Sequence, residues 1–163
     1  MKEKLVVIIG LVICCYGMTF AAAEPYIDPD YKKVAEAITL ETETCMQKQK
    51  SPVKKFECGD DLRKKYEQEG KIRGTETYCK VNYRDLSFNE LDKLFKKLRA
   101  RQKTARSSMD VMFDDQKPGE VTQEDLQTEL IWIESRLAGI QKANIQKMEK
   151  DLQSRPGLKP EKE

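Results

Sequence analysis

The sequence predicts an all-α domain, a small helical bundle of about four helices dominated by a long antiparallel helical hairpin. Two long stretches, 88–113 and 122–152, repeat apolar residues at three- and four-residue steps, which places those residues on one face of a helix. No stretch shows the alternating pattern of a half-buried strand. Each helix must bury its apolar face, so we expect the two long stretches to pack side by side.

The first predicted helix runs from about residue 30 to about residue 49. Both bounds are approximate, because helix ends predicted from sequence are uncertain by a few residues. Asp30 is expected to cap its first turn, and an apolar face follows until Ser51 and Pro52 interrupt it. These two residues fit the N-cap and the first position of a second helix, which Gly70 can close in the left-handed conformation. The stretch 71–86 has a poor periodic signal, and we expect a loop with about one helical turn there.

The third and fourth predicted helices form the hairpin. Ser87 and Glu90 have the spacing of a capping box, so a third helix is expected over 88–113. Thr122 is expected to cap the fourth helix, over 122–152. The connection between them is short and contains a proline and a glycine, so the two helices should run antiparallel.

The N-terminal segment has the features of a secretory signal peptide. Two lysines precede an apolar run, and Ala21 and Ala23 occupy the −3 and −1 positions of a small-residue cleavage site. The apolar run is shorter than the roughly 20 residues that span a bilayer, so we expect cleavage and no membrane association afterwards. The predicted organisation is a signal peptide over 1–23, a helical domain over 24–153 and a disordered tail over 154–163, and the predicted localisation is secreted.

Charge and composition exclude several function classes. The chain has 30 Lys and Arg residues against 28 Asp and Glu, so no net positive field attracts nucleic acid. It contains no histidine, which removes the commonest general base and the commonest zinc ligand. A Gly-rich phosphate-binding loop is also missing from the sequence. We therefore predict a protein that is not an enzyme and that has no catalytic residues, cofactor or metal.

Three of the five cysteines lie outside the predicted signal peptide: Cys45, Cys58 and Cys79. Cys45 and Cys58 come level if the first two helices turn back at Ser51, and we predict a disulfide between them. Cys79 would then be free or would join a second chain in a homodimer. Spacing alone does not fix connectivity, so Cys58–Cys79 and Cys45–Cys79 stay open as alternatives.

The third predicted helix carries the basic run K-K-L-R-A-R. Its cations are candidates for binding a partner: Lys96, Lys97, Arg99 and Arg101. Runs of this kind attract sulfate and phosphate groups, so a glycosaminoglycan is one candidate partner. The other interpretation is a solvated helix face, because a helix spreads these side chains over most of its circumference.

The predicted signal MKEKLVVIIGLVICC and the helical stretches LSFNELDKLFKKLRARQKTARSSM and TQEDLQTELIWIESRLAGIQ together resemble the anopheline mosquito salivary inhibitor family, the albicin- and anophensin-like proteins. The resemblance implies a secreted binding protein that inhibits a host plasma cascade without catalysis. Its partner would be a host plasma protein complex of the alternative complement pathway or of contact activation and coagulation. The resemblance transfers no individual site residue.

A carrier of an apolar ligand is the alternative function. Aromatic and methionine side chains would line its cavity: Phe88, Phe95, Met109, Met112 and Trp132. Trp132 has two other interpretations, as packing against the N-terminal helices or as an exposed anchor for a partner. Filling a two-layer bundle uses most of the apolar side chains, which favours the binding protein over the carrier.

Overall fold

The computed structural model describes residues 25–114 and 116–154, and this part of the chain is all-α. Its helices are α2 (Pro29–Lys48), α3 (Pro52–Gln68), α4 (Glu76–Asn82), α5 (Phe88–Gln102), α6 (Ser108–Phe113) and α7 (Gln123–Gln153). The predicted signal peptide lies outside the described residues, and so does the predicted tail beyond Ser154.

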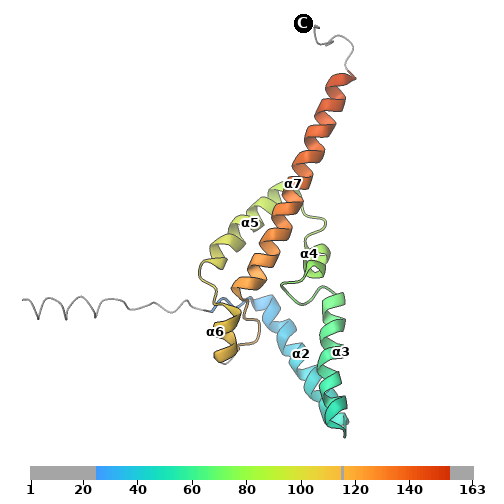
Figure 1. Ribbon diagram of the computed structural model, residues 1–163, viewed down its shortest axis with the longest axis vertical. Helices are drawn as coiled ribbons and strands as arrows, with labels where there is room; N and C mark the ends of the chain where they lie inside the picture. The colour runs from blue at the N-terminus through green and yellow to red at the C-terminus, as the bar shows by residue number, and fades with distance from the viewer. Residues whose placement is uncertain (1–24, 115, 155–163) are drawn as a thin grey trace, which may run out of the picture.

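The helices form two antiparallel pairs that meet at the middle of the molecule (Figure 1). α5 packs along the first half of α7 in the most extensive interhelical contact, and α2 packs on α3 in the next. The short helix α4 crosses α7 on the side away from α5, while the C-terminal half of α7 projects beyond the other helices. The predicted pairing of the third and fourth helices is therefore confirmed for α5 and α7.

The core lies between α4, α5 and the first half of α7. Leu91 of α5 and Leu126 and Ile133 of α7 are fully buried at its centre. The whole buried cluster comprises Cys79, Tyr83, Leu91, Leu98, Ala105, Val121, Leu126, Leu130 and Ile133. By contrast, α2 contains no buried residue, so the α2–α3 pair adds little to this core.

The N-terminal lead is tied to the connection before α7. The backbone amide of Val121 donates to the carbonyl of Tyr26 at 3.0 Å, and that of Asp28 donates to the carbonyl of Gly119 at 3.1 Å. Gly119 has a φ of 77°, and a Cβ atom there would lie 2.4 Å from the Cα atom of Lys32. Only glycine fits such a close approach, so this residue fixes where α2 begins relative to α7.

The start of α2 corrects the predicted cap. Asp28, not Asp30, is the N-cap, and its carboxylate accepts hydrogen bonds from the amides of Asp30 and Tyr31. Pro29 explains the shift, because its fixed φ suits the first helical position and it has no amide hydrogen to satisfy. The predicted ends of α3 agree with the structure, with Ser51 as N-cap residue and a positive φ just beyond the helix at Gly70.

The predicted helix over 88–113 is wrong in one respect: it is two helices. α5 ends at Gln102, and α6 starts anew at Ser108 after a turn. Ser107 and Asp110 form a capping box there, which satisfies backbone amides that a continuous helix would have bonded internally. The hairpin survives the break, because the side-chain amide of Gln123 at the start of α7 donates to the carbonyl of Gln102 at 3.3 Å.

The weak stretch 71–86 contains more helix than expected. Thr75 caps α4 by accepting a hydrogen bond from the amide of Tyr78 at 3.1 Å. Cys79 and Tyr83 are buried in the core against α5 and α7. Tertiary packing therefore stabilises a helix that is too short to show a clear period in the sequence.

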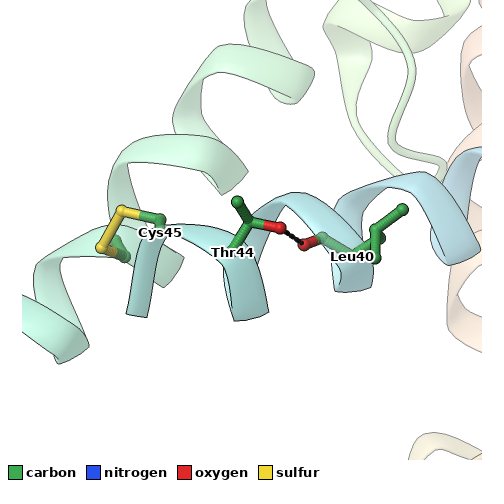
Figure 2. The surroundings of a disulfide bond; sticks show 4 residues. Leu40, Thr44 and Cys45 are labelled. Carbon is green, nitrogen blue, oxygen red and sulfur yellow. Dashed lines mark hydrogen bonds between the residues drawn. A yellow bond between two sulfur atoms is a disulfide. The ribbon is translucent and has the colours of Figure 1, made fainter. Parts of the chain in front are cut away.

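The predicted disulfide between Cys45 and Cys58 is confirmed. The two Cα atoms are 5.9 Å apart, and the bond joins the last turns of α2 to the first half of α3 (Figure 2). Cys79 is free and fully buried, and burial raises the pKa of its thiol to about 12. A disulfide between two chains would require this sulfur to leave the core, so the homodimer through Cys79 has no structural support.

Replacing Cys45 and Cys58 together by alanine should lower the free energy of unfolding by about 2 to 3 kcal/mol, because the short closed loop restrains the unfolded chain. Urea unfolding measured with and without reductant checks this. Reduction of the wild type should give the same loss, and the double variant should not respond to reductant. Equal stability of the oxidised and reduced wild type would contradict the prediction.

Candidate functional site

The most enclosed polar group of the described chain is an ion pair between Arg73 and Glu129. Arg73 follows α3, and its Nη1 donates to Oε1 of Glu129 on α7 at 2.9 Å. Its Nη2 donates to the carboxylate of Asp28, the cap of α2. The side chains of Arg73 and Glu129 are 10% and 0% exposed. One guanidinium thus joins three segments that are far apart in the sequence.

Aromatic side chains surround this ion pair. The guanidinium carbon of Arg73 lies 5.8 Å from the ring centre of Tyr31 and 5.1 Å from that of Tyr78, within cation–π range. The hydroxyl of Tyr83 donates to Oε2 of Glu129 at 2.8 Å. Trp132 packs against Tyr83 at 6.2 Å between ring centres, so it contacts the residue that caps the C-terminal end of α4 rather than the N-terminal helices.

Burial and mutual attraction set the protonation of this group. Burial raises the pKa of Glu129, while the Arg73 cation opposes that shift. Burial works against the charged form of Arg73, but the electrostatic attraction of several neighbours together, first among them Glu129, outweighs burial and raises the arginine pKa. Burial, together with the nearby Glu129 charge, also raises the pKa of the Tyr83 hydroxyl.

This arrangement positions helices and leaves no reactive group exposed. Glu129 is fully buried, and both of its oxygens already accept hydrogen bonds from protein donors. A catalytic acid or base must reach its substrate, and this carboxylate cannot. We conclude that the Arg73–Glu129 pair serves the fold.

Replacing Glu129 by alanine should lower the free energy of unfolding by about 3 to 5 kcal/mol, because it leaves the Arg73 charge buried without its main partner. Thermal or urea unfolding measures the loss. Glu134→Ala, at an exposed position of the same helix, is the matched control and should change stability by less than about 0.5 kcal/mol. A Glu129→Ala variant as stable as that control would contradict this role.

A second ion pair holds α6 in place. Nε of Arg106 donates to Oε1 of Glu120 at 2.7 Å, and Nη1 donates to Oδ2 of Asp114 at 2.5 Å. The amide and hydroxyl of Ser108 both donate to the carboxylate of Glu124 on α7, at 2.9 and 2.8 Å. The start of α6 is thus bonded to α7 through Glu124, and the residue after its end is bonded to Arg106, which precedes it.

Three of the side chains that α6 presents to solvent are large and apolar. Met109, Met112 and Phe113 are 68%, 85% and 86% exposed, whereas Val111 is buried beneath them. The three residues lie at positions i, i+3 and i+4, so they share one face of the helix. We call them the α6 patch. Large apolar side chains gathered on a surface commonly mark a binding site for another protein.

The structure does not gather the four candidate cations of α5 on one side. All four are exposed, and Nζ of Lys96 pairs with Asp92 at 2.7 Å. Arg99 lies over the ring of Phe95, and Arg101 over that of Tyr26. Arg99 and Arg101 are two residues apart, which separates them by about 200° around the helix axis. The remaining cation, Lys97, is also exposed.

The carrier hypothesis predicted that five side chains line one cavity, and the structure separates them. Met109 and Met112 project into solvent from α6, so they do not join Phe88, Phe95 and Trp132 around a ligand. A hollow of the described chain lies elsewhere, in the groove between α2 and α3. It has a volume of about 800 Å³ and is bordered by both acidic and basic side chains.

Sequence reasoning missed the α6 patch because it placed residues 108–113 inside a longer helix. The signal that could have found it is the serine-to-aspartate spacing from Ser107 to Asp110, which is that of a capping box. The Arg73–Glu129 pair was also missed. Its only signal is an acidic residue, Glu129, within the apolar face formed by Leu126, Leu130 and Ile133.

Comparisons with family models, with curated proteins and with solved structures found no match to this chain. Within the described residues, no helix is long and apolar enough to span a membrane. The same residues contain no group of three or more acidic or cysteine side chains placed to hold a metal ion.

Proposed function

We propose that this chain is a secreted, non-catalytic binding protein that inhibits a host plasma cascade by occupying a surface of a host protein complex. The observation that carries the proposal is the α6 patch. Methionine and phenylalanine are enriched in protein interfaces and depleted from surfaces that stay in water. The target cascade, the alternative complement pathway or contact activation and coagulation, comes from the resemblance to mosquito salivary inhibitors.

The contacts that hold α6 in place support a role in binding. Its first turn has a capping box, and Arg106 and Glu124 join its two ends to neighbouring segments. A patch held in one conformation loses less entropy when it binds than the same side chains on a free loop. Rigid presentation of three large apolar side chains therefore favours binding over simple surface exposure.

Cations on α5 would act mainly on the rate of association. Lys96 and Lys97 are exposed on α5, and Lys96 also pairs with Asp92 one turn earlier. Charges of this kind attract an acidic partner over roughly 8 Å at physiological ionic strength and are weakened by added salt. The same cations could contact a glycosaminoglycan, but their spread around α5 does not favour one linear polyanion.

Replacing Met112 and Phe113 together by serine should weaken inhibition by about 30-fold or more, which corresponds to the loss of about 2 kcal/mol from a binding anchor. Haemolysis by the alternative complement pathway and plasma clotting time are the two readouts. Val53→Ser with Phe56→Ser is the matched control, because it removes another exposed apolar pair, from α3. Full inhibition by the α6 variant, or none by the wild type in either assay, would refute the proposal.

Reversing Lys96 and Lys97 to glutamate should slow association with the target about tenfold at low salt, with little effect at high salt. Surface plasmon resonance at two salt concentrations measures the rates. Lys54→Glu with Lys55→Glu on α3 is the control with the same charge change. The full reversal of Lys96, Lys97, Arg99 and Arg101 should slow association further. An unchanged rate at low salt would show that these cations form only a solvated face.

A further inference from the structure

The C-terminal half of α7 has no partner within the described chain. Every residue from 141 to 154 is exposed, and Figure 1 shows this segment extending beyond the other helices. Three large apolar side chains lie on it, with Ile145, Met148 and Leu152 exposed by 57%, 65% and 51%. A helix that projects alone into water is only marginally stable, so an apolar stripe on it indicates a partner.

The stripe has the spacing of a coiled coil. Ile131, Ala138, Ile145 and Leu152 are each seven residues apart, and all four are exposed. Met148 lies three residues after Ile145, where the second apolar position of a heptad is expected. This stripe is distinct from the face of α7 that packs on α5. The same helix therefore has one apolar face buried inside the fold and a second one left exposed.

The charged residues beside the stripe complement those of a second copy of the helix that runs antiparallel to it. If the two copies cross between Ile145 and Met148, each Ile145 faces Met148 of the other copy. Lys142 then lies beside Glu149 of the other copy, and twofold symmetry makes this ion pair twice. Lys142 and Glu149 are seven residues apart, and neither takes part in an ion pair of the described residues.

A parallel arrangement lacks this complementarity. In parallel coiled coils, charged residues that flank the apolar positions pair across the interface. Each such residue contacts the residue five positions later on the other helix. Glu149 would then meet Asn144, and Lys142 would meet Leu137, so neither charge gains an opposite partner. Charge complementarity thus selects the antiparallel pairing of two identical segments.

We propose that the exposed half of α7 forms an antiparallel coiled coil with the same segment of a second copy of this chain. The segment has about 13 residues and a length of about 20 Å. Two helices of that length bury less than the roughly 800 Å² per partner of a standard interface. The dimer is therefore weak and depends on concentration, with a dissociation constant of about 1 to 100 μM.

Sedimentation equilibrium from about 1 μM to about 1 mM protein tests this. The wild type should pass from monomer to dimer across this range. Ile145→Glu with Leu152→Glu should weaken association at least about 100-fold. Ala143→Glu with Gln146→Glu adds the same charge to the other side of the helix and should leave the dimer unchanged. Circular dichroism verifies that all variants keep their helicity.

A charge exchange tests the orientation. Lys142→Glu should weaken the dimer about tenfold, and Lys142→Glu combined with Glu149→Lys should restore it. A monomeric wild type over the whole range, equal weakening by the two double-glutamate variants, or no restoration by the exchange would each overturn the proposal. A monomeric wild type that cosediments with phosphatidylcholine vesicles would overturn it by assigning the stripe to a lipid surface.

Discussion

The arrangement of the helices depends on one buried cation. Arg73 has bonds to the cap of α2 through Asp28 and to α7 through Glu129. It also lies against aromatic rings of α2 and α4. A charge removed from water is stabilised only when its partners are held in position, so each of these segments restrains the others. This contact links the sparsely packed α2–α3 pair to the core between α5 and α7.

Two glycines let the segments that Arg73 joins pack closely against each other. Gly74 follows Arg73 with a φ of 79°, and a Cβ atom there would lie 2.3 Å from the carboxylate of Asp125. Gly119 allows the same closeness between the connection before α7 and the start of α2. Larger residues at these two positions would push apart the segments that Arg73 joins. Polar bonding and steric fit therefore act at one place in the fold.

The parts of the fold that follow from local rules could be predicted from sequence. The capping residues Ser87 and Thr122, the antiparallel pairing of the two long stretches and the Cys45–Cys58 disulfide all depend on nearby residues and regular periodicity. Less could be predicted where distant residues decide the outcome. The helix break before Ser107 depends on Arg106 bonding to Glu120 and Asp114, and periodicity contains no information about such contacts.

The candidate surface was predicted less well than the fold for the same reason. The sequence drew attention to cations, because charge runs are visible without a structure, while the exposure of Met109, Met112 and Phe113 follows from the helix break. Before that break is known, these residues continue the apolar face of a longer helix. A single error in helix length thus hid the surface that best supports a binding function.

The sparse burial in α2 and α3 has a consequence for how the molecule opens. A segment with few buried side chains can unfold by itself at a free energy well below that of the whole protein. In α2–α3 only Cys58 and Tyr66 are buried, so the disulfide, the Arg73 junction and polar contacts such as that of Tyr66 with Glu41 restrain the pair. We therefore expect this pair of helices to open as a separate cooperative unit. In a reducing environment its backbone would become accessible to proteases while the core around Leu126 stays closed.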